Sequence, residues 1–246
     1  DFMRRRYVAY LSAMWRTAMF LLLPGVLAGQ TPSPTEWSTA ELIGLNEPSR
    51  DPAFMPVPAE WSNRAGLYLR REACEQFLAM ADAALRDGVR LVVVSAARNF
   101  TYQNGIWSRK WSRPEYAGWS DVEKARHILR FSAMPGSSRH HWGTEVDLNN
   151  LEYDWFRSGE GLRVAEWLDA HAAEFGFHQV YTDDPARPGY LPERWHWSYL
   201  PLAEPMLEAY NECVDAEALK QLEAPGMEWA DSLRILTDFV NGVDRP

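Results

Sequence analysis

Residues 138–147 read SRHHWGTEVD, and a later segment, residues 193–196, reads ERWH. Together they supply two imidazoles and a carboxylate that could hold one metal ion, with a further carboxylate, Glu193, three residues before the last ligand, His196. A hydrolytic zinc site needs three protein ligands, an open position for water, and a base that takes the proton of that water. The two segments therefore predict a single zinc site in a cleft.

The adjacent histidines of the first segment leave one ligand open. In an unbroken strand, residues six apart share a face and residues seven apart do not, so His141 would be the natural partner of Asp147. Gly143 permits a break or bulge that would bring His140 to that face instead. The spacing alone does not choose between the two histidines.

The second segment raises a similar question about the side on which its residues lie. Strand alternation would put Glu193 on the opposite face from His196. The two share a site only if Glu193 belongs to the turn before the strand, and Pro192 favours such a turn.

The periodicity around these segments predicts an α+β domain with a small, mainly antiparallel sheet and helices packed against it. Helices are expected at residues 71–87, 102–111, 122–131 and 162–175, and strands at 90–95, 143–148, 177–181 and 194–199. The chain from Ala203 onward is expected to be mostly helical, with a break near Pro225. Lys110 and its cationic neighbours are interpreted as a solvated helix face. For Trp142, Trp195 and Trp197, core packing is favoured over substrate contact.

The domain organisation follows from composition. Residues 1–28, with a basic start and an apolar run, are predicted to be a signal peptide or an N-terminal anchor. Residues 29–64 are rich in proline and are predicted to be an extended arm or linker. Residues 65–246 are predicted to form the zinc-binding domain, which carries the two segments and ends in a helical tail. The sequence makes no prediction about the oligomeric state.

Charge and cysteine content narrow the partners and the compartment. The net charge of the whole chain is −9, and residues 1–28 hold four of the 25 basic and one of the 34 acidic residues, so the remainder carries −12. Such a surface repels nucleic acid and anionic membranes, and no partner of either kind is expected beyond an uncleaved anchor. Cys74 and Cys213 are the right number for one disulfide in an oxidising compartment, but the sequence does not say whether they meet.

Three motifs resemble those of the VanY-type zinc D,D-carboxypeptidases, which belong to the LAS metallopeptidases together with D-Ala-D-Ala dipeptidases and L,D-carboxypeptidases of bacterial cell walls. The family's Ser-x-His-x-x-Gly-x-Ala-x-Asp is matched by residues 138–147, except that Glu145 stands where the family usually has Ala. Its Glu-x-Trp-His-x-x-Tyr is matched by residues 193–199 without exception. Residues 95–103 resemble Ser-Gly-Tyr-Arg-Ser-x-x-x-Gln, with Ala96-Ala97 in place of Gly-Tyr.

The resemblance runs from about Tyr68 to about Leu202 and implies a role for each matched residue. It implies that one zinc ion is bound by His140, Asp147 and His196, with Glu193 as general base. It implies that Arg98 faces the scissile carbonyl or the terminal carboxylate of the substrate, and that Gln103 and Ser138 hydrogen-bond the peptide. Glu145 either repels an anionic substrate or points away from it.

These roles imply a secreted zinc carboxypeptidase, in the periplasm or cell envelope, that removes the terminal D-Ala of peptidoglycan stem peptides. The alternatives within the enzyme class are an L,D-carboxypeptidase, a D-Ala-D-Ala dipeptidase and a stem-peptide endopeptidase. A zinc-stabilised peptidoglycan-binding module without turnover is the non-enzyme alternative. The presence of Glu193 argues against it, because a structural metal site has no need of a base.

Overall fold

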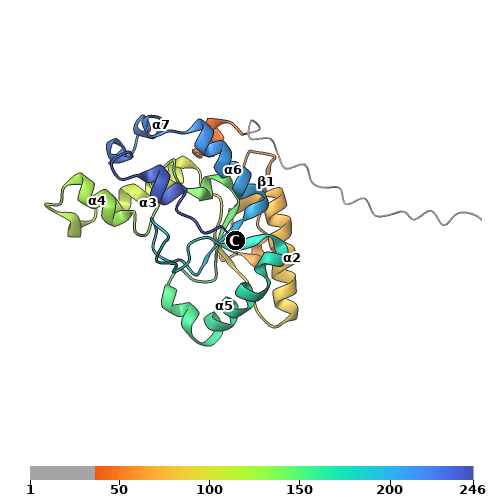
Figure 1. Cartoon of the computed structure of the whole chain (residues 1–246). Coiled ribbons are helices and arrows are strands. Elements are labelled where there is room, and N and C mark those ends of the chain that lie inside the picture. The colour runs from red at the N-terminus through yellow and green to blue at the C-terminus, as the bar shows by residue number, and fades with distance from the viewer. Residues whose placement is uncertain (1–36, 246) are drawn as a thin grey trace, which may run out of the picture. The chain divides into compact units, whose positions relative to one another are not determined.

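The computed structural model describes residues 37–245, and its centre is a four-stranded sheet with the order β3-β4-β6-β5 (Figure 1). Every neighbouring pair of strands in this sheet is antiparallel. The strands are β3 (Val93–Ser95), β4 (Glu145–Leu148), β5 (Phe177–Gln179) and β6 (His196–Tyr199). Each lies within a predicted segment and is shorter than it. The prediction of a small, mainly antiparallel sheet with helices against it is confirmed.

The register of β4 against β6 joins the two segments from which the zinc site was predicted. Asp147 is directly paired with His196, and Glu145 with Ser198. Side chains of directly paired residues lie on the same face, with their Cβ atoms about 4.5–5.5 Å apart. The backbone pairing alone therefore brings the carboxylate and the second imidazole side by side.

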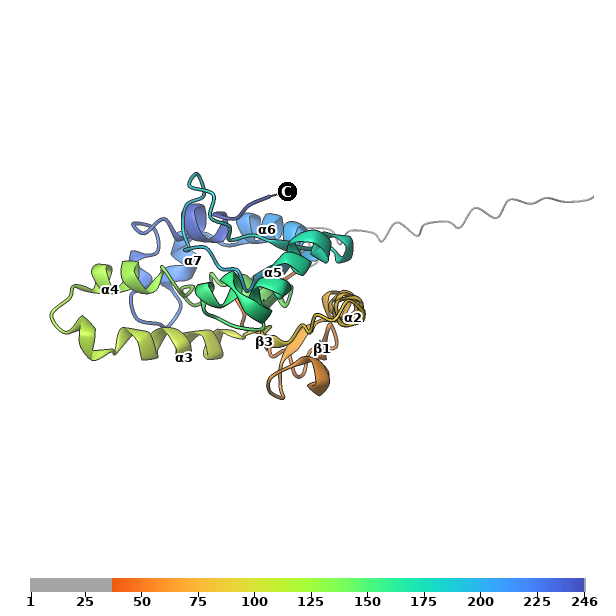
Figure 2. The ribbon, with the colours of Figure 1, turned by 90° about the horizontal axis from the view of Figure 1, so that it is seen from below.

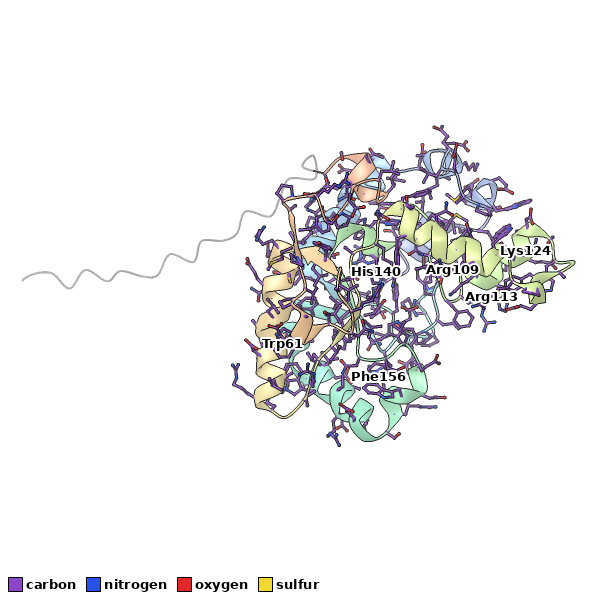
Figure 3. The ribbon with its side chains drawn as sticks, turned by 180° about the vertical axis from the view of Figure 1, so that it is seen from behind. Trp61, Arg109, Arg113, Lys124, His140 and Phe156 are labelled. Carbon is purple, nitrogen blue, oxygen red and sulfur yellow. The ribbon has the colours of Figure 1, made fainter. Side chains whose placement is uncertain are left out.

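The opposite face of the same two strands is apolar. Val146, Leu148 and Trp197 are buried in a core that also contains residues of α2 (Arg71–Arg86) and α5 (Gly159–His171). Two further contributors, Trp61 and Phe156, are labelled in Figure 3. Strand alternation thus separates a face that packs against helices from a face that carries the polar residues.

Helix α2 confirms the helix predicted over residues 71–87. Cys74, Phe77 and Ala81 recur at spacings of three and four and are fully buried, which places one face of the helix in the core. Gly88 follows the helix with φ 79°, a left-handed conformation that glycine adopts without steric penalty. Helix α5 is continued by the short helix η6 (Ala172–Phe175). This helix, like α2, is followed by a left-handed glycine, Gly176.

A second core lies among α3 (Phe100–Trp111), α4 (Asp121–Ile128) and α6 (Leu200–Cys213). Figures 1 and 2 show α3 and α4 side by side, at the opposite end of the described residues from α2. Asn99 caps α3 by accepting a hydrogen bond of 2.8 Å from the Tyr102 amide, which accounts for its start. The remaining short elements on this side are η3 (Pro114–Tyr116), α7 (Ala216–Lys220), η7 (Met227–Trp229) and η8 (Ile235–Val240).

The described part of the predicted arm is folded onto the domain. It contains α1 (Thr39–Leu42), η2 (Ala59–Trp61) and β1 (Phe54–Pro56), which pairs with β2 (Tyr68–Arg70) in a two-stranded sheet. Several apolar residues between the prolines are buried, among them Leu42, which is fully shielded from solvent. Residues 37–64 therefore contribute to the core, which a composition rich in proline does not reveal.

The predicted signal peptide or anchor, residues 1–28, and the first part of the arm lie outside the described residues. Within residues 37–245, no helix combines the length and the apolar character needed to cross a membrane. Cys74 is buried in α2 and Cys213 is exposed at the end of α6, and the structure does not join them in a disulfide.

Candidate metal centre

A tight turn before β4 determines which histidine faces the site. Arg139–Trp142 form the 3-10 turn η4, and Gly143 follows it with φ 73°. A Cβ atom at Gly143 would lie 2.3 Å from the Phe54 ring, so the position requires glycine for space as well as for conformation. The turn interrupts strand alternation, as a break at this glycine was expected to do.

The break directs His140 into the site and His141 away from it. The Nδ1 atom of His141 donates to the Arg98 carbonyl at 2.7 Å, and its Nε2 accepts from the Gly136 amide at 3.1 Å. Burial lowers the pKa of His141 to about 4, in keeping with a neutral ring that has one donor and one acceptor nitrogen. His141 thus joins two backbone segments, and the parity argument that favoured it does not apply.

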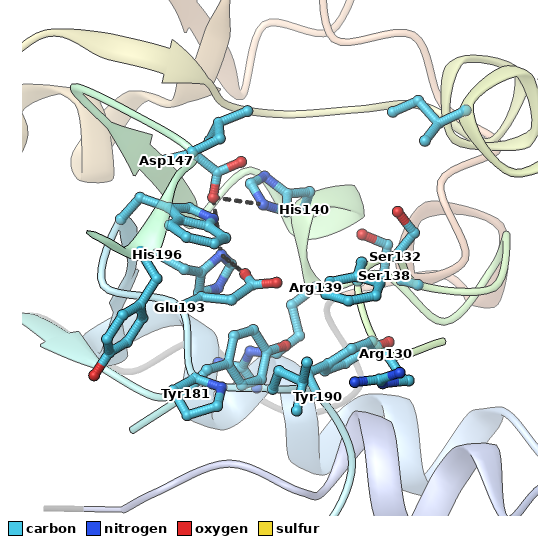
Figure 4. A pocket seen from close by; sticks show the side chains of 18 of the residues that line it. Arg130, Ser132, Ser138, Arg139, His140, Asp147, Tyr181, Tyr190, Glu193 and His196 are labelled. Carbon is cyan, nitrogen blue, oxygen red and sulfur yellow. Dashed lines mark hydrogen bonds and ion pairs between the residues drawn. The ribbon is translucent and has the colours of Figure 1, made fainter. Parts of the chain in front are cut away.

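His140, Asp147 and His196 form a buried group that could hold a metal ion (Figure 4). One donor atom from each residue lies within 4.8 Å of the others. The Asp147 Oδ1 atom is 3.4 Å from His140 Nε2 and 3.1 Å from His196 Nδ1. Two imidazoles and one carboxylate are the donor set of many catalytic zinc sites.

The two imidazoles turn the correct nitrogens toward this group. His140 donates from Nδ1 to the Ala96 carbonyl at 2.8 Å, which leaves Nε2 for the site. His196 has its Nε2 atom 2.8 Å from a Glu145 carboxylate oxygen, which leaves Nδ1 for the site. A second hydrogen bond of this kind commonly fixes a metal-binding histidine in one tautomer. The residues present therefore fit a zinc ion.

Glu193 lies beside the group, in the turn before β6, where sharing a site with His196 requires it to be. Its Oε2 atom is 3.9 Å from His196 Nδ1 (Figure 4). The Glu193 amide donates to the Tyr181 carbonyl at 2.9 Å, and its own carbonyl accepts from the His196 amide at 3.2 Å. Burial raises the pKa of Glu193 to about 7, so this carboxyl group exchanges its proton near neutral pH.

Attraction between opposite charges dominates the electrostatics of His140, Asp147 and His196. Burial favours the neutral ring of His196, but hydrogen bonds with Asp147 and Glu145 outweigh it and raise the pKa of His196 to about 9. Burial also opposes ionisation of Asp147, but His140, His196 and Arg98 hold its pKa well below the usual value. The carboxylate that a cation would meet is therefore already ionised.

Arg98 forms an ion pair with Asp147, one of the three candidate metal ligands, and its guanidinium group is not free in the pocket. Its Nη2 donates to Asp147 Oδ2 at 2.7 Å and its Nε to Ser95 Oγ at 2.9 Å. Its Nη1 is 3.4 Å from Gln103 Oε1, and Gln103 in turn donates to the Ala133 carbonyl at 2.8 Å. Gln103 is fully buried and does not line the pocket, whereas its hydrogen-bond partners Arg98 and Ala133 do line it. Ser138 does line the pocket.

The group opens into a pocket of about 730 Å³, whose lining includes residues that the sequence analysis did not select. Tyr181 and Tyr190 form one side, as Figure 4 shows, and Trp195 lines the pocket rather than packing wholly in the core. Lys110, interpreted from the sequence as part of a solvated face, also lines it, as does Arg130. The signal that could have found Lys110 is its position seven residues after Gln103, on the same face of α3.

The protein is thus an α+β domain with a candidate metal-binding hydrolytic centre on the polar face of its sheet. Residues 66–202, more than half of the chain, match the family model described as "VanY: D-alanyl-D-alanine carboxypeptidase". The chain therefore belongs to the VanY family, and the resemblance predicted from the three motifs is confirmed.

Individual relatives agree with this assignment. The chain is 32% identical over 167 residues to a D-alanyl-D-alanine carboxypeptidase of Enterococcus faecalis, covering 67% of this chain and 59% of the relative. It is 27% identical over 139 residues to the putative carboxypeptidase YodJ of Bacillus subtilis, covering 54% of this chain and 46% of that protein. The matches thus span about half of the length of these relatives.

A solved structure supports the fold. The LD-carboxypeptidase LdcB superposes with a TM-score of 0.51 at 20% identity, covering 71% of this chain and 80% of that one.

Proposed function

We propose that the protein is a zinc-dependent carboxypeptidase that hydrolyses the bond to the terminal D-Ala of peptidoglycan stem peptides. The observation that carries this proposal is the convergence of His140, Asp147 and His196 on one point, with the Glu193 carboxylate beside it. A zinc ion held there would lower the pKa of a bound water toward ~7 and would polarise the peptide carbonyl.

The protein's own residues supply the proton transfers and the orientation. Glu193 accepts a proton from the attacking water and delivers it to the leaving amine, a task suited to a carboxyl group whose pKa is about 7. Arg98 stands beside Asp147 and faces the negative charge that develops on the carbonyl oxygen. Ser138 offers a hydroxyl group to the peptide from the pocket wall.

Of the two roles that the resemblance implies for Arg98, its contacts favour the one at the scissile carbonyl. Three of its nitrogen atoms bond Asp147, Ser95 and Gln103. A guanidinium group held in this way next to a metal ligand stabilises charge at the reacting centre, and it has less freedom to follow a carboxylate one residue further along the substrate.

The substrate bond separates the candidate activities. Incubation with a stem pentapeptide, a tetrapeptide, D-Ala-D-Ala and a cross-linked dimer, followed by mass spectrometry, distinguishes D,D-carboxypeptidase, L,D-carboxypeptidase, dipeptidase and endopeptidase. We expect loss of one D-Ala from the pentapeptide. Cleavage of the tetrapeptide alone would contradict D,D specificity and favour the L,D alternative.

Replacement of the base separates an enzyme from a zinc-stabilised binding module. The variant Glu193→Gln should lower kcat on the order of 10²–10⁴-fold, with one zinc per chain retained. Unchanged turnover in this variant would refute the role of Glu193. A wild-type protein that binds zinc and peptidoglycan but cleaves none of the peptides would favour the binding module.

The same proposal includes the compartment. A substrate in the cell wall requires export to the periplasm or cell envelope, in agreement with the signal peptide or anchor predicted over residues 1–28. Immunoblotting of cell fractions for the full-length protein checks this location.

A further inference from the structure

We propose that Glu145 is a positioning residue that holds the His196 ring with its proton on Nε2 and with Nδ1 directed at the metal. The inference rests on the metal site of the proposed function and goes beyond it, because Glu145 is the position at which this chain departs from the Ala of its family's motif. It assigns a task to a carboxylate whose effect the sequence leaves open.

The contacts of the His196 ring carry the argument. One edge of the ring places Nε2 at 2.8 Å from Glu145 Oε2, and the other places Nδ1 at 3.1 Å from Asp147 Oδ1. A carboxylate only accepts hydrogen bonds, so Glu145 requires a proton on Nε2. A neutral imidazole with its proton on Nε2 has its lone pair on Nδ1, which is the nitrogen that faces the metal group.

Glu145 is itself fixed from several sides. Its Oε1 atom accepts from Ser198 Oγ at 2.8 Å and from Thr144 Oγ1 at 3.1 Å, and it lies 3.2 Å from Arg139 Nη2. Arg139 also donates to Ser198 Oγ at 2.9 Å. Because the buried carboxylate has both a cation and hydrogen-bond donors, it can remain in place without solvent. Rotation of the His196 ring would leave this carboxylate without its imidazole partner.

The two histidines of the site are oriented by different kinds of hydrogen-bond acceptor. The second nitrogen of His140 is fixed by a backbone carbonyl, that of Ala96, which no substitution can remove. The second nitrogen of His196 is fixed by a side chain, which explains why an acidic residue is useful at position 145. Glu145 is fully buried and does not line the pocket. It therefore does not face the pocket, which favours the second of the two alternatives that the sequence left open for Glu145, a side chain directed away from the substrate.

The test measures metal affinity without any substrate. In the variant Glu145→Gln of the full chain, the amide oxygen is a weaker acceptor than the carboxylate, and when that oxygen turns toward Arg139 the NH₂ group meets His196 Nε2 and opposes a proton there. We expect the zinc Kd, measured by competition with a chromophoric chelator, to rise about 10- to 100-fold. We also expect the visible absorption bands of the cobalt-substituted protein to shift. The matched control Glu166→Gln, on an exposed position of α5, should leave both readouts unchanged.

A second variant separates positioning from folding. The single variant leaves the buried Arg139 without its carboxylate partner. The double variant Arg139→Met/Glu145→Gln also removes this cation. A Kd that stays raised while the thermal midpoint returns toward wild type supports the proposal. A Kd within about twofold of wild type in either variant overturns it. An inactive wild-type protein would refute the proposed function, but the comparison of zinc affinities would still decide the role of Glu145.

Discussion

Alternate residues of the strand pair β4 and β6 lie on opposite faces, and one face is apolar whereas the other is polar. One face places Val146, Leu148 and Trp197 in a helix-covered core. The other places Asp147 and His196 in a buried polar group. Burying apolar groups stabilises a fold, whereas burying ionisable groups does so only when partners compensate for lost water. One face therefore stabilises the fold, and the other uses part of that stability to hold reactive groups out of solvent.

Two substitutions, one on the apolar face of the strand pair and one beside its polar face, should have opposite effects on stability and on activity. Leu148→Ala removes a fully buried side chain and should lower the free energy of unfolding by about 2–5 kcal/mol. The zinc Kd and the rate per folded molecule should stay near wild type. Glu193→Gln should show the reverse, with the rate loss given above and no loss of stability at pH 8. Chemical denaturation and kcat/KM measured on both variants check the pair.

Titration of Glu193 should make the free energy of unfolding fall as the pH rises. Its pKa is raised to about 7 in the folded metal-free protein from the 4.5 of an ordinary glutamate. The proton that the folded state binds more tightly stabilises it fully below about pH 4.5, and this contribution is lost as the pH rises through 7. Glu193→Gln should therefore flatten the fall in stability between pH 5 and pH 8, because glutamine does not titrate. An unchanged slope would contradict the assignment.

The polar face is also expected to bind its ion in competition with protons. The pKa of His196 is raised to about 9 in the metal-free protein, so its Nδ1 carries a proton at neutral pH that a metal must displace. The apparent zinc affinity should therefore rise about tenfold per pH unit up to about pH 9 and then level off. Chelator competition in a series of buffers measures this slope. A flat profile between pH 6 and pH 8 would show that His196 is already neutral there.

The sequence predicted the parts of the molecule that depend on local patterns. Helix α2 and the sheet followed from spacing and β-branched runs, because burial on one face imposes those periods directly. The break at Gly143 could be named as an option, since glycine permits a left-handed turn. The choice of His140 over His141 needed the family motif. His141 is held by the Arg98 carbonyl, and this contact joins two distant segments that local spacing does not relate.

What the sequence did not reveal is set by tertiary contacts. Proline content suggested an arm over residues 29–64, yet burial of Leu42 and Phe54 depends on surfaces contributed by other parts of the chain. The same holds for Glu145, whose role becomes visible only when Ser198 and Arg139 surround it. Residue spacing describes one segment at a time, and these contacts join several.

Lys110 lies in the pocket wall at the outer edge of the polar face. A carboxypeptidase needs a cation for the free carboxylate of its substrate. Arg98 is paired with Asp147 and Arg139 with Glu145, whereas Lys110 forms no ion pair within residues 37–245. The Lys110 ammonium group lies in the pocket wall, 2.5 Å from the Ser132 hydroxyl. These contacts favour Lys110 as the cation that meets the terminal carboxylate.

Lys110→Met should therefore raise KM about 10- to 100-fold for a peptide with a free C-terminus, the range expected for one charged hydrogen bond. The same peptide with a C-terminal amide should be cleaved poorly by both proteins, and the substitution should change its kcat/KM little. Arg109→Met is the matched control, since Arg109 is the next cation on α3 and is exposed (Figure 3). Equal losses on the acid and the amide would assign Lys110 to the structure of the wall. In that case Arg130 would be the remaining cation of the pocket lining to test, because it too has no ion pair among the described residues.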